Sequence, residues 1–468
     1  MTRPWLRFAA ERAERYLDGL GERPVGARSS FAELRAALQG PLPEDGAPPE
    51  AAVARLADGV EAGLVASAGP RYFGFVIGGS VPAALAADWL TSAWDQNAGL
   101  TATSPAAMAV EDVVAGWVKE LLGLPASASV GFVTGGQMAN FTGLLAGRHA
   151  VLERAGWNVE EDGLIGAPPV RVLVGDEAHV TIFSALRMLG LGAKRAQKVA
   201  ADEQGRMRPE ALAAALGAGS GPTLVCAQAG NVSTGAFDPL DAIAAIAHRH
   251  GAWLHVDGAF GLWAAAAPSL RHLLGGVAKA DSWAVDAHKW LNVPYDSGIA
   301  IVADAASHRA AFSKRADYLI PAAGGERDGH DYTPESSRRA RVFPLYAALL
   351  SLGRRGVAEL IESSCAQARR LADALRRDPS LRILNDVVLN QVLVRFEPPA
   401  GRDGDAFTRA VGERVRREGT LWASGTKRHG REALRLSVSN WSTSEADIDR
   451  VAAAILQAVA ECGTAVET

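Results

Sequence analysis

The sequence has few cysteines, no excess of charge of one sign and no long uninterrupted hydrophobic run, and each shortage excludes a class of protein. The three cysteines, Cys226, Cys365 and Cys462, are far apart and match neither a disulfide framework nor a metal-ligand spacing, which indicates a reduced, cytoplasmic protein without a metal site. The 48 basic and 52 acidic residues give a formal net charge of -4, so we expect no general attraction to nucleic acid or to an anionic membrane.

The first residues are typical of neither a signal peptide nor a membrane span, because charged side chains such as Arg3, Arg7 and Glu11 interrupt them. Over the whole chain, 48% hydrophobic and 21% charged residues are typical of a folded globular protein. A length of 468 residues predicts about three structural units.

Three parts of the chain differ in their pattern. Residues 1–65 read as helices around a Pro- and Gly-rich link, without strands, so we expect a segment that packs on another surface. Residues 66–336 alternate short β-branched runs with helical stretches, which predicts a large α/β domain with a mostly parallel central sheet and helices on both faces. Residues 337–468 predict a small C-terminal α/β domain whose last helix starts at a capping box, Ser442 to Glu445. The strands expected in the large domain are 129–133, 170–174, 223–227, 253–256, 282–285 and 298–302.

Several of these strands end in residues suited to one ligand, and ligands of open parallel sheets bind beyond the carboxyl ends of the strands. After the first strand, Gly135, Gly136 and Gln137 open a helix, where free N–H groups favour an anion such as phosphate. Many such turns are only tight connections. His179 follows the second strand, where a packed or capping histidine is the alternative, and Asn231 follows the third in a polar turn.

The next two strands end in groups that are costly to bury. Asp257 ends a very apolar strand, so its carboxylate needs a cationic partner or a proton. Lys289 follows the fifth strand, beside His288 and two tryptophans. An ammonium that leaves water favours its neutral amine, which is the nucleophile that Schiff-base chemistry needs. The alternative is a surface lysine at a strand end.

One ligand satisfies all of these positions. Pyridoxal 5'-phosphate would place its phosphate at Gly135 to Gln137, its protonated ring nitrogen at Asp257 and its ring face at His179. Its aldehyde would join Lys289. The buried carboxylate would then gain a cation, and the ring would draw electrons from a substrate.

In this order the motifs resemble those of the pyridoxal-phosphate-dependent group II decarboxylases, which include the aromatic amino acid, tyrosine and glutamate decarboxylases. The most specific motif is His-Lys-Trp at 288–290, preceded by HVDGAFG at 255–261. The resemblance implies the PLP-dependent transferase fold type I, as in aspartate aminotransferase. It also implies an obligate homodimer with active sites at the subunit interface, so that residues 1–65 would pack on the partner subunit. Further matching motifs are TGGQMAN at 134–140, GDEAH at 175–179, TGAFDPL at 234–240 and the stretch 337–356.

The resemblance also implies roles for single residues. Lys289 corresponds to the lysine that forms the internal aldimine, and Asp257 to the partner of the pyridine nitrogen. Ala259 corresponds to the small residue under the ring. His179 corresponds to the stacking histidine that also helps to place the substrate, and His288 lies beside the phosphate.

Two positions depart from the family pattern. Asp286 and Ala287 stand where many relatives have Asn-Pro, so an acid replaces an amide beside the phosphate. It would repel the phosphate unless it turns away or binds a hydroxyl. Gln137 stands where serine or threonine is common.

After the large domain, residues 318–341 are expected to form a mobile loop that closes over the site. Tyr332 in this loop resembles a tyrosine of the neighbouring subunit that protonates the carbanion left by carbon dioxide. The alternative is a loop tyrosine packed on its own chain.

These features predict a lyase that releases carbon dioxide and an amine from an L-amino acid. Phe73, Phe75 and Val76 form either core packing or a pocket wall, and an aromatic wall would suit an aromatic substrate. Arg435 is either a ligand for the substrate carboxylate or an exposed strand arginine. The alternatives on the same scaffold are amino transfer and oxidative decarboxylation to an aldehyde, and a more remote one is a catalytically silent dimeric homologue.

Overall fold

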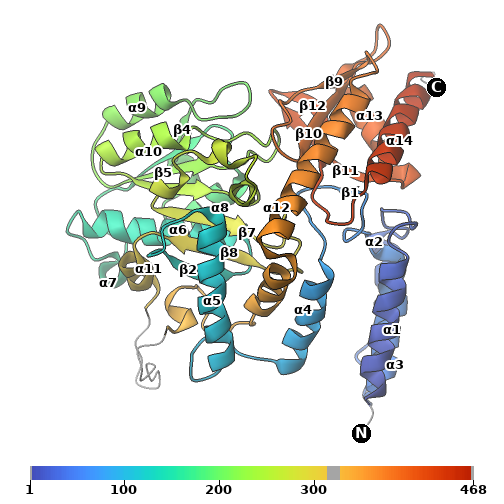
Figure 1. Cartoon of the computed structure of the whole chain (residues 1–468), viewed down its shortest axis with the longest axis horizontal. Coiled ribbons are helices and arrows are strands. Elements are labelled where there is room, and N and C mark those ends of the chain that lie inside the picture. Colours follow the sequence, from blue (N-terminus) through green and yellow to red (C-terminus); the bar gives the residue numbers. More distant parts are fainter. Residues whose placement is uncertain (1–2, 314–326, 465–468) are drawn as a thin grey trace. The chain divides into compact units, whose positions relative to one another are not determined.

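The computed structural model describes residues 3–313 and 327–464, which form two compact units (Figure 1). The larger unit contains residues 78–369 and 385–392, and the remaining segments form the smaller unit. The expected loop 318–341 lies partly outside the described residues, which resume at Arg327.

The units differ from the domain boundaries expected at 65/66 and 336/337. The first 77 residues belong with the C-terminal segments, because β1 (Tyr72–Phe73) pairs in parallel with β11 (Trp422–Arg428). This pairing joins strands far apart in the sequence, and a two-residue strand gives no periodic signal of its own.

The larger unit is built on a seven-stranded sheet with the order β2-β8-β7-β6-β5-β3-β4. Neighbours from β7 to β4 run parallel, whereas β8 is antiparallel to both β2 and β7, so the expected mostly parallel sheet is confirmed. All the expected strands are present, and only the short β4, whose first two side chains are exposed, was missed. The strands are β2 (Ser129–Val133), β3 (Arg171–Gly175), β4 (Gln197–Val199), β5 (Thr223–Gln228), β6 (Trp253–Asp257), β7 (Ser282–Asp286) and β8 (Gly298–Val302).

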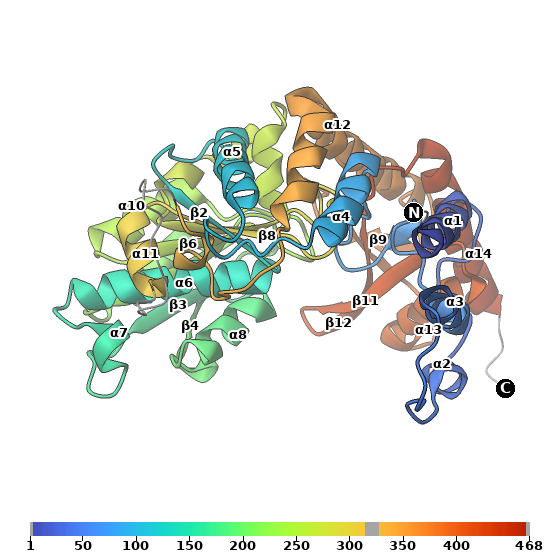
Figure 2. The ribbon, with the colours of Figure 1, turned by 90° about the horizontal axis from the view of Figure 1, so that it is seen from below.

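Helices cover both faces of this sheet (Figure 2). On one face, α6 (Gly136–Glu153) packs against β5 to β8, with α8 (Val180–Met188) and α11 (Ala305–Phe312) beside it. On the other face, α9 (Pro209–Gly217) packs against β4, and α10 (Leu240–Arg249) packs against β5 and β6. Because both faces are covered, β5 to β8 are buried along their whole length. The other α-helices that lie in or begin in this unit are α4 (Pro82–Trp94), α5 (Pro105–Leu122), α7 (Val159–Asp162) and α12 (Val342–Leu375).

The smaller unit contains a five-stranded sheet with the order β1-β11-β12-β10-β9. Its remaining strands are β9 (Leu381–Ile383), β10 (Gln391–Phe396) and β12 (Arg431–Ser437). Its helices are α1 (Pro4–Asp18), α2 (Phe31–Leu38), α3 (Pro49–Val60), α13 (Gly404–Glu418) and α14 (Glu445–Thr464). Among the described residues, every helix is too short or too polar to span a bilayer.

The capping box expected at Ser442 to Glu445 is wrong by two residues. The Ser444 hydroxyl accepts the Asp447 N–H at 3.2 Å, and the Ser444 N–H donates to the Asp447 carboxylate at 3.0 Å. Both pairs have a serine three residues before an acid, so the sequence pattern alone does not separate the two registers.

The strands β2, β3, β5, β6 and β7 point the same way, because β2 and β7 both run antiparallel to β8. Their carboxyl ends therefore meet at one edge of the sheet, where Gly298 begins β8. A Cβ atom on Gly298 would lie 2.4 Å from the Cα atom of Gly135. Only glycine at this position lets the turn after β2 pack directly on β8.

We expect Gly298→Ala to displace the Gly135 turn, because the added methyl group meets backbone atoms that cannot rotate away. Overpacking of this kind costs about 1–3 kcal/mol, so pyridoxal 5'-phosphate should bind about tenfold more weakly or worse. Absorbance titration of the cofactor-free protein measures the affinity, with the melting temperature recorded in parallel. Gly116→Ala in α5 is the matched control, since nothing lies within 4 Å of its added Cβ atom. Equal affinities for the two variants would contradict the packing argument.

Candidate active site

The turn after β2 presents the N-terminus of α6 to the sheet edge. Gly135 is the N-cap and Gly136 the first helical residue, so the N–H groups of the first turn have no partner within the helix. A Cβ atom on Gly135 would lie 2.9 Å from the His288 ring, and one on Gly136 would lie 2.7 Å from the Asp286 carboxylate. The paired glycines therefore let the residues after β7 approach a helix end that favours an anion.

Lys289 points to the same turn. Its Nζ atom lies 2.9 Å from the Asp286 Oδ2 atom, and its side chain keeps 23% of its surface exposed. The Asp286 side chain is only 1% exposed, and its Oδ1 atom lies 3.5 Å from the His288 Nε2 atom. The structure thus joins Lys289 and His288, both expected in the site, through the acid that departs from the family pattern.

His288 is held as a neutral ring. Its Nδ1 atom accepts the backbone N–H of Ser297 at 3.0 Å, so this nitrogen carries no proton and the proton of the neutral ring is on Nε2. Burial lowers the pKa of His288, although the nearby Asp286 opposes this effect. The Tyr295 ring lies 4.4 Å from the imidazole. His288 therefore offers a fixed Nε2–H donor beside the glycine turn.

Asp257 ends β6 as a buried carboxylate, 8% exposed. It accepts the Ala259 N–H at 3.1 Å and the Asn140 amide at 3.2 Å. It forms no ion pair with any side chain in the part of the chain that the structure describes. A protonated pyridine nitrogen would supply the cation that this carboxylate lacks.

A directed chain of hydrogen bonds supports Asp257. Because a carboxylate only accepts, Asn140 donates through its nitrogen, and its oxygen accepts from His255 Nε2 at 2.8 Å. The His255 Nδ1 atom then accepts from Ser282 at 2.9 Å, and the Ser282 oxygen accepts from Trp253 at 2.9 Å. Burial lowers the pKa of His255 to about 3, so the ring is neutral.

Sequence reasoning missed Asn140, His255 and Ser282 as members of the site. The first two stand inside the motifs TGGQMAN and HVDGAFG, so the resemblance drew attention to the stretches but not to their roles. Gly143 was a further signal. A Cβ atom there would lie 2.8 Å from the His255 ring, so this glycine brings α6 close enough for Asn140 to bond His255.

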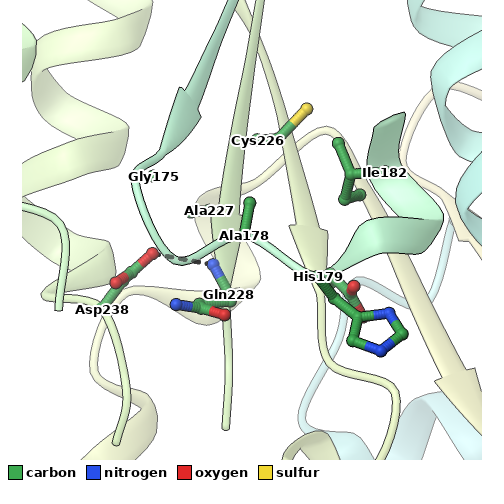
Figure 3. Close-up of a pocket in the computed structure, with 9 residues that line it drawn as sticks. Gly175, Ala178, His179, Ile182, Cys226, Ala227, Gln228 and Asp238 are labelled. Atoms are coloured by element: carbon green, nitrogen blue, oxygen red, sulfur yellow. Dashed lines mark hydrogen bonds between the residues drawn. The ribbon is translucent and has the colours of Figure 1, made fainter. Parts of the chain in front are cut away.

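His179 lies at the N-cap of α8, where its Nδ1 atom accepts the Thr181 N–H and lies 2.8 Å from the Thr181 hydroxyl. Thr181 also accepts a hydrogen bond from Asn140 at 3.2 Å, which links His179 to the support of Asp257. His179 and Asp257 line a cavity of about 10 Å3, on the order of the space for one water molecule. Figure 3 shows His179 at one side of this cavity. The carboxyl ends of β3 and β6 thus both border this cavity.

Asp238 closes the far side of the same cavity (Figure 3). Its two carboxylate oxygens accept the backbone N–H groups of Met207 at 2.7 Å and Gln228 at 2.8 Å. Burial raises the pKa of Asp238 to about 7, against the opposite effect of these two hydrogen bonds. Asp238 therefore joins the end of β5 to the segment before α9, where Met207 lies.

Two residues expected to bind the cofactor have other contacts here. The Asn231 oxygen accepts the N–H groups of Ser233 and Thr234, and its amide donates to Glu177 at 3.2 Å, so the side chain shapes its own turn. Gln137 is exposed, and its amide donates to the Met188 sulfur at 3.8 Å. At the start of α6, Gln137 would therefore offer its backbone N–H, and not its side chain, to the cofactor.

Tyr332 packs on its own chain beside the start of β2, the end opposite the glycine turn. Its carbonyl accepts from His308 at 3.1 Å, and His308 in turn bonds Ser129, the first residue of β2. The Tyr332 ring lies edge-on to the His308 ring, and the Arg327 guanidinium lies 4.2 Å above it. These contacts favour the packing alternative for Tyr332.

In the smaller unit, Phe73 is fully buried and belongs to the core, whereas Phe75 is 56% exposed and stacks on Trp422 at 5.5 Å. Trp422 also stacks on Tyr72 at 5.1 Å. Arg435 is buried on β12, so the alternative of an exposed strand arginine is wrong. The aromatic stack is thus a surface feature with one open face.

The residues at the sheet edge fit pyridoxal 5'-phosphate. The helix end at Gly135 and Gly136 suits a phosphate, the unpaired Asp257 carboxylate suits a protonated ring nitrogen, and Lys289 presents an accessible amine. Ala259 lies between the helix end and Asp257. Its Cβ atom is 3.6 Å from the Cβ position of Gly136, and its N–H donates to Asp257.

Comparisons with known proteins agree with this geometry. The model of the pyridoxal-dependent decarboxylase conserved domain matches residues 33–397. Tryptophan decarboxylase 1 of Oryza sativa subsp. japonica is 30% identical over 467 aligned residues, which cover 94% of this chain and 90% of that protein. L-2,4-diaminobutyrate decarboxylase of Rhizobium meliloti is 31% identical, with 83% of this chain and 77% of that protein covered.

Solved structures give the same result. The Oryza sativa TDC crystallised with PLP and tryptamine superposes with a TM-score of 0.92 at 27% identity, covering 99% of this chain and 98% of that one. Mouse CSAD superposes with a TM-score of 0.90 at 26% identity, again covering 99% and 98%. The expected fold type I and the expected cofactor are thereby confirmed. The chain therefore belongs to the pyridoxal-dependent decarboxylase family, whose members are amino acid carboxy-lyases that use pyridoxal 5'-phosphate.

Proposed function

We propose that this decarboxylase acts on an L-amino acid with an aromatic side chain and releases carbon dioxide and the corresponding amine. The observation that carries the proposal is the meeting of Lys289, Asp257, His179 and the Gly135 turn at one sheet edge. Support for an aromatic substrate comes from the similarity to a tryptophan decarboxylase over nearly the whole chain.

The chain's own residues divide the work at the site. When bound, pyridoxal 5'-phosphate supplies an electron sink for the bond between the substrate Cα and its carboxylate. Asp257, fixed by Asn140 and the Ala259 N–H, would hold a proton at the ring nitrogen and so keep that sink effective. The Gly135 turn would hold the phosphate, which would keep the scissile bond in one orientation. Lys289 would hold the aldehyde through its amine.

Replacing Lys289 with alanine should abolish turnover, because no other amine in the described site can make the covalent link. The visible absorbance of the bound cofactor should also lose its covalent component. Spectra recorded before and after borohydride reduction, followed by mass spectrometry of the peptide that contains residue 289, measure both effects. Retention of the wild-type rate in this variant would overturn the assignment.

Proton return is proposed for His179 or for a tyrosine of the loop 318–341. The contacts of Tyr332 with His308 and Arg327 favour a packing role, so we expect Tyr332→Phe to keep at least half of the wild-type rate. Tyr318→Phe, at the other tyrosine of this loop and outside the described residues, is the matched variant. Stopped-flow rates and the ratio of amine to aldehyde product are the measurements. A loss of about a hundredfold in Tyr332→Phe alone would give that residue the proton-donor role.

We also propose that the enzyme works as a homodimer in the cytoplasm. The helices α1, α2 and α3 contain no buried residue in the single chain, and Trp5, Leu6 and Phe31 are exposed. Exposed apolar side chains on three consecutive helices support packing on a partner subunit. The three cysteines are free, which is consistent with a reducing compartment.

The substrate proposal predicts the outcome of a panel assay. With L-tryptophan, L-tyrosine, L-glutamate, cysteine sulfinic acid and L-2,4-diaminobutyrate offered at equal concentration, we expect an aromatic substrate to have the highest kcat/KM. Carbon dioxide release and product identification are the measurements. Faster turnover of an acidic or basic substrate would contradict the aromatic assignment, and a keto acid or an aldehyde with ammonia would contradict simple decarboxylation.

A further inference from the structure

Asp286 is a buried acid whose place in the site the family pattern does not explain. It is the last residue of β7, where its N–H donates to the Ala259 carbonyl at 2.8 Å and its carbonyl accepts the Trp263 indole N–H at 2.8 Å. These two bonds and the register with Gly298 fix its backbone. The Cβ atom of Asp286 therefore has a fixed place at the sheet edge.

The carboxylate of Asp286 lies against the phosphate turn. Its Oδ2 atom would be 2.7 Å from a Cβ atom on Gly136, and its Oδ1 atom 3.6 Å from one on Gly135. Neither oxygen accepts a regular hydrogen bond, from the helix end or elsewhere in the described chain. Asp286 is therefore not an N-cap of α6, although its negative charge occupies the space beside that helix end.

The charge of Asp286 is balanced by Lys289. A buried carboxylate is costly unless a cation pairs with it, and the Lys289 Nζ atom lies at 2.9 Å. His288 faces the other oxygen at 3.5 Å but is held neutral, because its Nδ1 atom accepts from Ser297 and burial lowers its pKa. His288 thus contributes a dipole and Lys289 the full positive charge.

We propose that Asp286 is a positioning residue that holds the Lys289 ammonium at the phosphate turn whenever this lysine is not covalently engaged, and that its charge weakens phosphate binding there. The inference rests on the proposed placement of the cofactor between Gly135 and Lys289. The ion pair with Lys289 explains why an acid is tolerated beside an anion site. The same carboxylate that repels the phosphate gives the released lysine a fixed place to return to.

Two consequences separate this role from a merely structural one. First, a neutral amide at residue 286 should favour ligands that carry a phosphate over ligands that lack one. Second, removal of the carboxylate should destabilise the ammonium form of Lys289, so the amine becomes reactive at lower pH. A residue that only maintained the strand end would change neither the selectivity for phosphate nor the pH profile of the lysine.

The test compares wild type and Asp286→Asn, both freed of cofactor, in absorbance titrations with pyridoxal 5'-phosphate and with pyridoxal. We expect the variant to bind pyridoxal 5'-phosphate about tenfold more tightly relative to pyridoxal than the wild type does, which corresponds to about 1.4 kcal/mol. An equal ratio of the two affinities in both proteins would overturn the phosphate part of the proposal.

The lysine part has its own readout. The rate at which pyridoxal and borohydride modify Lys289 is measured against pH, and the profile should move to lower pH in Asp286→Asn, because the ion pair at 2.9 Å is lost. An unchanged profile would overturn this part. Asp296→Asn is the matched control, because it removes the same charge from the loop after β7, at a residue paired with Arg341 at 3.0 Å. It should leave both the affinity ratio and the profile unchanged.

The failure of the placement itself is distinguishable from the failure of this inference. If wild-type Lys289 is not the residue modified by pyridoxal 5'-phosphate and borohydride, the proposed site is wrong whatever Asp286→Asn does. If Lys289 is modified and Asp286→Asn behaves as the wild type, the proposed cofactor site is retained and only the proposed role of Asp286 is rejected. Circular dichroism and melting temperature confirm that the variant is folded before either comparison.

Discussion

The buried carboxylate of Asp257 is the charge around which the larger unit is arranged. Burial without an ion pair is costly, and the structure limits this cost with the Ala259 N–H and the Asn140 amide. Asn140 is fixed by His255, His255 by Ser282, and Ser282 by Trp253. Because each donor and acceptor in this series has one role, the series ties α6, β6 and β7 together and leaves Asp257 ready for a cation from outside the chain.

Positive and negative groups alternate along the sheet edge. The helix end at Gly135 attracts an anion, Asp286 is negative, Lys289 is positive, and Asp257 is negative. A ligand with a phosphate at one end and a basic nitrogen at the other matches the two ends of this series. The acid at residue 286 is the exception, and the lysine beside it compensates while it carries its proton. Tight packing of Gly136 against Asp286 and of Gly298 against Gly135 brings the helix end directly onto β7 and β8.

Sequence reasoning found the strands and the residues at their ends, because apolar β-branched runs and the motifs at 255–261 and 288–290 are local signals. It missed Asn140, His255 and Ser282, whose roles come from contacts between α6, β6 and β7. The grouping of residues 1–77 with the C-terminal segments was not visible for the same reason, since β1 pairs with a strand about 350 residues later. The capping box failed because two overlapping serine–acid pairs compete. The sequence therefore predicted the strands and the residues at their ends, whereas it did not predict which distant segments pair in the fold.

The antiparallel strand β8 has a consequence for how the site forms. It follows β7 directly and pairs with it, so residues 282–302 make a hairpin that carries Lys289 in its loop. Contacts of such low sequence separation close with little loss of chain entropy, whereas β2 and β6 must find β8 and β7 from more distant parts of the chain. The segment that contains Lys289 therefore pairs at a small cost in chain entropy, whereas the Gly135 turn depends on contacts between strands far apart in the sequence.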